Sequence, residues 1–359
     1  MNGKPTIMIS FREGGENGGP YVSHRRIMES ELKETYNFIP LIIPKGHLGL
    51  LNIKVLKFLY NQIKSENPDV IHFTGLQLEG FHVIIACKLA RIKKTIIAIH
   101  GSSMEAIEIS KLKKFILNIV EIVTLKLTYF SYGVSNYVTE WPRVKKYSKR
   151  CFGCIYNIPS DKKELLQPNV TIRKELGIDD DEIVIVSTGR ITKEKGYETL
   201  CNVIKKAKTD SKVRFIIAGD GPYLSEMRQE LYEYVKSGKV FLLGYRNDIN
   251  RILEGSNIFV ICSLHETLCI SLLEAASNGL ALIGSNVGGI PEIIEENKSG
   301  YLVQPNNIDQ FVHTIEGLAN DKNKIQNFGN HAYNYVRKKF DEKEIMKKIN
   351  ELYDKVLNS

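Results

Sequence analysis

Two glutamates in one short stretch of the chain, Glu266 and Glu274, have a spacing that would let their carboxylates bind separate parts of one ligand. Glu274 lies two turns into an expected helix, roughly 12 Å along its axis from Glu266, too far to share a proton. The amides of Leu268, Cys269 and Ile270 fall at the expected helix start, where unpaired N–H groups and the helix dipole favour an anion. Hydroxyls at both ends of a ligand with phosphate between them describe a nucleotide sugar. The alternative is an ordinary amphipathic helix with two solvated glutamates.

Cationic and glycine residues follow other expected strands in the same half of the chain. They are Gly189, Arg190 and Lys195 after 182–187, Gly219 to Gly221 after 213–218, and Tyr245 with Arg246 after 240–243. Parallel strands present their carboxyl ends at one edge of a sheet, where ligands bind. The arginine fork and the lysine point charge both suit a diphosphate.

The first half of the chain carries a weaker signal of the same kind. A strand at 6–10 runs into a loop with Gly14, Gly15, Gly18 and Gly19, and Pro20 suits the first turn of a helix. This arrangement predicts either an anion cradle or a plain tight turn. Two histidines, His72 and His100, follow expected strands. Each could either form a loop hydrogen bond or line a ligand cleft, and the repeat of a strand-end histidine followed by glycine favours the cleft for His100.

These residues need a scaffold, and short β runs that alternate with helices predict an α/β fold of parallel sheets. In the first half we expect strands at 37–43, 69–73, 95–100 and 151–156, and helices at 53–65, 81–91 and 111–130. The turn-forming segment 157–161 is the expected linker. The pattern then restarts, with strands at 182–187, 213–218, 240–243, 257–261 and 300–303 and closing helices from Ile308, Lys322 and Glu342.

Charge is unevenly distributed along the chain. The formal net charge is +8; residues 1–150 carry roughly +10, so the rest of the chain is near neutral or slightly acidic. A basic half predicts an anionic partner, nucleic acid or an anionic membrane surface, unless the whole surface is simply basic. The segment 111–130 reads either as a buried core helix or as an interfacial helix on anionic lipid. No face interleaves aromatic and basic residues as a nucleic-acid binder would.

The compartment follows from what the sequence lacks. No apolar leader and no spanning run of about 18 apolar residues is visible. The Cys151–Cys154 spacing has no second ligand pair for zinc, so reduced thiols are expected. We expect a cytoplasmic protein, peripheral on the inner face of the cell membrane if lipid is the partner.

The chain resembles the retaining glycosyltransferases of family four (glycosyl transferases group 1), which have the GT-B fold. The matching pieces are STGRITKEKGYETL, FIIAGDGPYL, VFLLGYRNDI, HETLCISLLEA, NVGGIPEII and SGYLV. The resemblance implies two Rossmann-like domains that face each other across a cleft. It implies an acceptor domain at 1–160, a nucleotide-sugar domain at 161–340, and a helix at 341–359 that returns to the first domain.

The resemblance also assigns roles to residues. Arg190 and Lys195 would hold the diphosphate, Glu274 the ribose, and Glu266 the donor sugar. The other donor contacts it implies are Gly18, Gly19, Gly189, Gly221, Tyr245, Arg246, Thr267, Leu268, Cys269 and Ile270, with His100 near the sugar. Many members have Gly-Phe-Gly where this chain has Thr267-Leu268-Cys269, so here a threonine hydroxyl is available to the donor.

These implications together predict a retaining, metal-independent transfer from a nucleoside diphosphate sugar. UDP is the commonest nucleotide of the family, and the acceptor would be a lipid-linked or surface-polysaccharide glycan. Glu266, His100, Arg190 and Lys195 are the expected catalytic residues. No Asp-x-Asp metal motif stands at a strand end, because Asp179 to Asp181 lie in a turn before a strand. A sugar-nucleotide epimerase of similar fold and a non-catalytic nucleotide-sugar-binding subunit are the alternatives.

Overall fold

The computed structural model describes residues 3–15, 18–46, 49–105, 110–158, 170–208 and 212–359. The chain forms two compact units. Unit 1 comprises Met1–Ile158 and Phe340–Ser359, and unit 2 comprises Pro159–Lys339. These limits lie within two residues of the expected boundaries at 160 and 340. Of the expected linker, residues 159–161 lie outside the described part of the chain.

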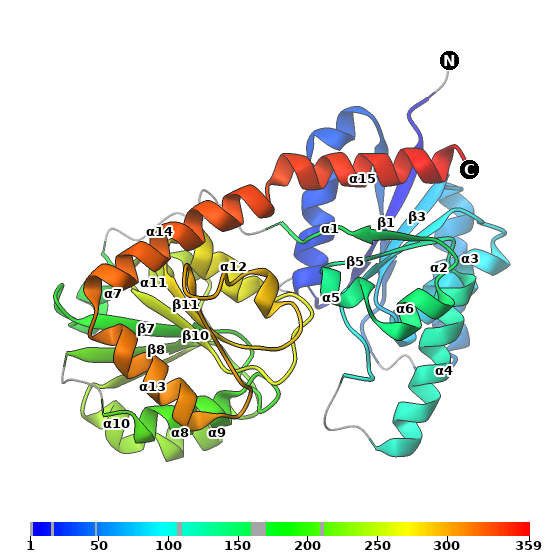
Figure 1. Ribbon diagram of the computed structural model, residues 1–359. Coiled ribbons are helices and arrows are strands. Elements are labelled where there is room, and N and C mark those ends of the chain that lie inside the picture. The colour runs from blue at the N-terminus through cyan, green and yellow to red at the C-terminus, as the bar shows by residue number, and fades with distance from the viewer. Residues whose placement is uncertain (1–2, 16–17, 47–48, 106–109, 159–169, 209–211) are drawn as a thin grey trace. The chain divides into compact units, whose positions relative to one another are not determined.

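Unit 1 contains a six-stranded parallel sheet in the order β2-β1-β3-β4-β5-β6 (Figure 1). Short runs rich in isoleucine and phenylalanine form its strands, as both-face burial of a parallel sheet requires. The strands are β1 (Thr6–Arg12), β2 (Asn37–Ile43), β3 (Val70–Thr74), β4 (Thr95–Ile99), β5 (Phe130–Gly133) and β6 (Cys151–Cys154).

The helices of unit 1 cover both faces of this sheet. They are α1 (Gly19–Glu29), η1 (Glu31–Glu34), α2 (Ile53–Glu66), α3 (Leu78–Leu89), α4 (Lys111–Leu127), α5 (Asn136–Thr139), α6 (Pro142–Tyr147) and α15 (Glu342–Leu357). Right-handed crossovers place α2, α3 and α4 on one face, where α3 contacts both of its neighbours (Figure 1). Alternate residues of β3 show the two faces: Ile71 and Phe73 pack among these helices, while His72 hydrogen-bonds Tyr353 of α15.

Unit 2 repeats the design with the strand order β12-β11-β10-β7-β8-β9. Its strands are β7 (Ile183–Thr188), β8 (Val213–Ala218), β9 (Val240–Gly244), β10 (Ile258–Ile261), β11 (Ala281–Ser285) and β12 (Gly300–Val303). All the pairings between them are parallel. The strand order reverses direction beside β7, so a crevice for a ligand is expected at the carboxyl ends there.

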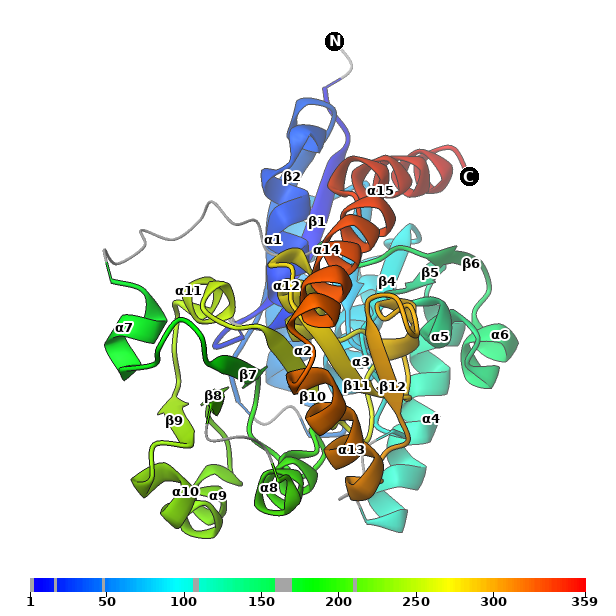
Figure 2. The ribbon, with the colours of Figure 1, turned by 60° about the vertical axis from the view of Figure 1, so that its left-hand side comes forward.

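The helices of unit 2 also lie on both faces. They are α7 (Ile172–Leu176), α8 (Tyr197–Lys206), α9 (Leu224–Glu230), α10 (Tyr232–Lys236), α11 (Ile249–Glu254), α12 (Ile270–Ser277), η2 (Ile290–Glu292), α13 (Ile308–Ala319) and α14 (Lys322–Lys339). One apolar core joins α8, α9 and α13 to β7 and β8, and α13 lies beside α8 (Figure 2). The opposite face receives α11 and α12.

The sequence-based elements agree with these bounds to within a few residues. Two differences reach three residues: α3 begins at Leu78 where the helix was expected from 81, and α4 ends at Leu127 where the helix was expected to run to 130, since β5 begins at Phe130. Thr128 closes the helix end with a hydroxyl that donates to the Thr124 carbonyl at 2.7 Å. No disulfide joins the six cysteines, all of which are described. Within the described residues, no helix is both long and apolar enough to cross a membrane.

Candidate active site

The loops after β7, β8, β10 and β11 are tied to one another at the carboxyl edge of the unit 2 sheet. Each tie is a backbone hydrogen bond in which an amide of one loop donates to a carbonyl of the next. The bonds run from Ile191 to Asp220 (2.9 Å), from Leu264 to Glu194 (2.9 Å) and from Gly289 to Glu266 (3.2 Å). These bonds hold the backbones of the four loops against one another at this edge.

A buried ion pair lies at the centre of this edge. The Lys195 ammonium contacts Glu266 Oε1 at 2.7 Å, and the Ser263 hydroxyl donates to the same oxygen at 3.1 Å. The Glu266 side chain is 6% exposed and that of Lys195 is 29% exposed. Burial opposes the charge of Lys195, but the neighbouring Glu266 outweighs it, so the pKa of Lys195 is raised above its ordinary value. Lys195 is therefore a cation at neutral pH.

Arg190 adds a second cation from the same loop. Its positive charge is felt by Lys195, where it acts to lower the lysine pKa, and its side chain is exposed. No hydrogen bond or ion pair between described residues engages its guanidinium. Gly189 before it has a φ of 147°, a backbone conformation that other residues rarely adopt. The chain thus turns sharply at the end of β7 and leaves the arginine fork exposed to solvent at this edge.

The amino end of α12 borders the ion pair. The helix begins at Ile270, and Cys269 precedes it with no side-chain cap on the helix. Burial first, and the charge of Glu266 second, raise the pKa of the Cys269 thiol to about 12, so the thiol is neutral at physiological pH. The Leu268 and Cys269 side chains are buried and Thr267 is half-buried. The positive end of the helix dipole and the two cations thus meet in one place.

Gly288 and Gly289 hold the loop that carries Glu266, a role that sequence reasoning did not identify. A Cβ atom at Gly288 would overlap the carbonyl of Glu266, and one at Gly289 would overlap the carbonyl of Thr267. Gly288 also has a φ of 56°. The sequence signal was the glycine pair itself in the turn that follows a strand, which marks close backbone approach. Ser263 was likewise missed, because a serine after a strand is unremarkable until its partner is known.

Gly221 and Glu274 occupy different surroundings. A Cβ at Gly221 would overlap the backbone of Ile191, and its amide donates to Asp220 Oδ1 at 2.7 Å. Gly221 therefore packs the β8 loop against the β7 loop. Glu274 is half-buried in the middle of α12, between the buried residues Leu273 and Ala275. The structure thus places Glu274 on the helix whose amino end adjoins Glu266.

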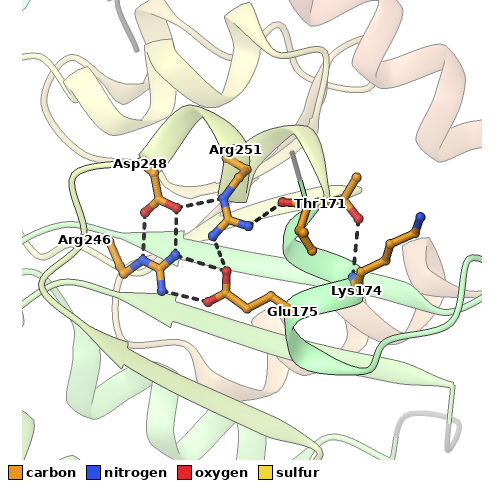
Figure 3. Close-up of polar contacts among 7 residues, drawn as sticks. Thr171, Lys174, Glu175, Arg246, Asp248 and Arg251 are labelled. Atoms are coloured by element: carbon orange, nitrogen blue, oxygen red, sulfur yellow. Dashed lines mark hydrogen bonds and ion pairs between the residues drawn. The ribbon is translucent and has the colours of Figure 1, made fainter. Parts of the chain in front are cut away.

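Arg246 is engaged by acidic residues of its own unit (Figure 3). It donates through two nitrogens to Asp248 at 2.7 Å each and contacts Glu175 at 2.9 Å. Arg251, 6% exposed, contacts the same two acids and donates to the Val170 carbonyl at 2.7 Å. Hydrogen bonds from Arg246 hold the pKa of Asp248 well below its ordinary value. This network fixes the loop after β9 and leaves Tyr245 63% exposed next to it.

Three predicted site residues, Gly18, Gly19 and His100, lie in unit 1. Gly18 precedes α1 with an extended backbone and no side-chain cap on the helix. His100 follows β4, and burial with the nearby His24 lowers its pKa to about 3. The approach of these residues to the donor stays a prediction.

His100 belongs to a buried polar cluster in unit 1. The His24 and His72 rings lie 4.6 Å apart edge to face, and His24 Nδ1 is 2.9 Å from the Ser10 carbonyl. His72 hydrogen-bonds the hydroxyls of Tyr353 (2.8 Å) and Tyr132 (3.0 Å). Burial lowers the pKa of both histidines, that of His24 to about 4. These rings are therefore neutral at physiological pH.

No group of three or more histidine, cysteine, aspartate or glutamate side chains in the described part of the chain is arranged to hold a metal ion. Asp181, in the acidic turn noted above, pairs with Lys212.

Comparisons with known proteins place this geometry in a family context. Residues 169–335 match the family model of glycosyl transferases group 1, and residues 22–130 match that of glycosyl transferase 4-like proteins. The first match covers every residue of the edge just described.

Two curated relatives and one solved structure are similar to the chain. The UDP-Gal:alpha-D-GlcNAc-diphosphoundecaprenol alpha-1,3-galactosyltransferase of Escherichia coli is 28% identical over 330 residues, 89% of this chain and 84% of the relative. The N-acetyl-alpha-D-glucosaminyl L-malate synthase of Bacillus anthracis is 25% identical over 203 residues, 56% of this chain and about half (53%) of the relative. The structure of Anabaena HepE in complex with UDP-glucose aligns with a TM-score of 0.75 at 17% identity, covering 98% of this chain and 99% of HepE.

Proposed function

The chain belongs to the glycosyl transferases group 1 family, has the GT-B fold and is a glycosyltransferase, and from that premise we propose that it retains anomeric configuration, needs no metal and uses a UDP-hexose as donor. We propose as acceptor a hydroxyl of a lipid-linked or surface-polysaccharide glycan. Membership of this family does not favour the epimerase or the non-catalytic subunit.

The observation that carries the proposal is the Lys195–Glu266 pair at 2.7 Å beside the amino end of α12. Lys195 and Arg190 supply positive charge where a diphosphate would leave, and the helix dipole adds to it. Glu266 holds Lys195 in position and offers a carboxylate to the hydroxyls of a donor sugar. Lys195 and Arg190 lie on the loop after β7, and Glu266 lies on the loop after β10 that leads into α12. A backbone hydrogen bond joins these two loops.

The proposed reaction forms no covalent bond between the sugar and the enzyme. The bond between the anomeric carbon and the β-phosphate oxygen breaks, and its electron pair leaves with the diphosphate. The acceptor oxygen forms its bond to the anomeric carbon on the same face, and the acceptor proton passes to the departing phosphate. Lys195, Arg190 and the α12 amides stabilise the charge that grows on that phosphate, which is the work a divalent cation does in other transferases.

The donor and acceptor assignments draw on the Escherichia coli relative, whose name specifies UDP-galactose and a diphosphoundecaprenol-linked acceptor. It aligns over 84% of its own length, so the likeness extends through both units. The UDP-hexose and the lipid-linked glycan are carried to this chain as proposals on that support.

Paired lysine variants test the proposal. Lys195→Ala should lower transfer from a UDP-hexose at least a hundredfold, as removal of one well-placed charge-stabilising group does. Lys193→Ala is the matched control, because Lys193 is exposed and pairs with Glu198 and Glu226 away from the site. Equal activity in the two variants would refute the site assignment.

Two further measurements test the stereochemistry and the metal. The anomeric proton coupling of the glycoside product, measured by NMR, should show the donor configuration. The inverted anomer would refute retention. Chelation with EDTA should leave the rate unchanged, whereas a rate restored only by Mg²⁺ or Mn²⁺ would refute metal independence.

A further inference from the structure

The helix α4 of unit 1 has apolar residues on two opposite sides. One side, formed by Leu117, Val120, Thr124 and Leu125, is buried against the unit, where α4 contacts α3 and α6. The other side carries apolar residues that face solvent, with the i, i+3, i+4, i+7 spacing of a single helical stripe. They are Leu112 (72% exposed), Phe115 (63%), Ile116 (37%) and Ile119 (47%).

Positive charge flanks this exposed stripe and negative charge is absent from it. Lys111 and Lys113, both exposed, precede and follow Leu112 and so lie on either side of the stripe. The one acidic residue of α4, Glu121, is 0% exposed and lies inside the unit. There it contacts Arg143 at 2.6 Å and accepts from the Ser103 amide at 2.6 Å. The charged residues on the outward side of α4 are therefore all cations.

The start of α2 repeats this composition. Leu50 (54% exposed), Leu51 (58%) and Ile53 (74%) precede or begin the helix, and Lys54 and Lys57 are exposed beside them. The first turn of α2 has no acidic residue. Both helices lie on one face of the sheet with α3 between them, and each follows a parallel strand, so both begin at the carboxyl edge of the sheet (Figure 1).

We propose that the exposed stripe of α4 and the start of α2 dock unit 1 on an anionic lipid bilayer. Apolar side chains enter the boundary between headgroups and acyl chains, and the lysines meet lipid phosphates. A second copy of the chain fits the surface less well, because a two-fold interface sets the same lysines of both copies near one another. The docking itself is argued from this surface alone, but its use rests on the proposed function. An enzyme docked in this way would meet a lipid-linked acceptor at the sheet edge where unit 1 would bind it.

Vesicle sedimentation of the full chain tests this docking. Wild type should pellet with vesicles of phosphatidylcholine and phosphatidylglycerol, bind phosphatidylcholine alone more weakly, and lose affinity as salt increases. The triple variant Leu112→Gln, Phe115→Gln, Ile119→Gln should bind the anionic vesicles at least tenfold more weakly. Tyr232→Gln with Val235→Gln is the matched control, because these exposed apolar residues (61% and 40%) lie on α10 of unit 2.

Three readouts keep docking separate from folding, from self-association and from catalysis. Circular dichroism should be the same for the triple variant and wild type, and transfer to a short, water-soluble acceptor should be unchanged. Wild type that stays in the supernatant with anionic vesicles, or a triple variant that binds them equally well, would overturn the proposal. So would a wild-type dimer in sedimentation equilibrium that the triple variant abolishes. Failure of the proposed function would instead appear as no transfer to the soluble acceptor with vesicle binding intact.

Discussion

The variant Lys195→Met isolates what the buried ion pair contributes to stability. It removes the ammonium and keeps an apolar stem, so Glu266, with 6% of its side chain exposed, retains the Ser263 hydroxyl but loses its counter-ion. Removing one partner of a buried pair costs about 3–5 kcal/mol, and the 29% exposure of Lys195 brings our expectation down to about 2–3 kcal/mol. For a unit of this size that corresponds to a drop in Tm of roughly 5–10 °C.

A second change separates the lost pair from lost packing. In the double variant Lys195→Met, Glu266→Gln the buried charge is gone, so more than half of the lost stability should return. Transfer activity should be lowered about a hundredfold or more in both variants, because the Lys195 ammonium is missing from each. The assay is calorimetric unfolding of the full chain, with Lys193→Met as the surface control. A double variant no more stable than Lys195→Met would refute the reasoning, as would an equal loss from Lys193→Met.

The pH dependence of this difference has a definite sign. The folded pKa of Lys195 lies above its ordinary value of 10.5, because Glu266 outweighs the opposing effect of burial. The contribution of the pair is therefore complete at neutral pH and is lost only as pH rises through that raised value. The Tm gap between wild type and Lys195→Met should be constant between about pH 6 and 9 and should shrink in more alkaline solution.

Three other outcomes follow from the structure. Gly288→Ala should lower kcat at least tenfold, because the new Cβ displaces the Glu266 carbonyl. Gly238→Ala should affect stability alone, because Gly238 has a positive φ of 74° but open space around it. Equal kcat values in the two variants would contradict this. Arg246→Ala and Glu175→Gln should each raise the donor KM roughly threefold to tenfold, equivalent to about 0.7–1.4 kcal/mol, by releasing the loop after β9, whereas the exposed Arg228→Ala should not. The urea midpoint of unit 1 should fall as pH drops from 6.5 towards 4. The folded pKa values of His24, His72 and His100 are lowered, so the stability that these neutral rings give is complete above the unfolded pKa of 6.5 and is lost below it. The buried Trp141, the single tryptophan, reports on this unit by fluorescence, and a midpoint independent of pH would contradict the neutral state of the three rings.

Local pattern was enough to place the strand ends and therefore the loops. Short apolar runs followed by glycine stop where the chain must turn, so the positions of Arg190, Lys195 and Glu266 after parallel strands could be predicted. Their meeting at one edge then follows from topology alone. The starts of α2, α4, α13 and α14 agree with prediction for the same reason, since each begins where an amphipathic pattern begins.

Pairings across the chain could not be predicted in this way. Lys195 with Glu266 and Glu175 with Arg246 are both 71 residues apart. The first pair lies on two strand-end loops that topology brings together, whereas Glu175 lies on a short helix that no periodic pattern relates to β9. The contact of His72 with Tyr353 spans 281 residues, and nothing near either residue signals the other.

Unit 1 is built from two segments far apart in the sequence, and this sets the order in which the two units can fold during synthesis. Its sheet and most of its helices leave the ribosome before residue 158, but α15 is made only after all of Pro159–Lys339. Until then the His72 ring lacks the Tyr353 hydroxyl, and Tyr36 lacks Asn350 and Asp354, which accept its hydrogen bond at 2.8 and 2.9 Å. Unit 2, a continuous segment, can therefore complete its fold first, and a nascent chain stopped before α15 would expose the polar cluster of unit 1 to water and to proteases.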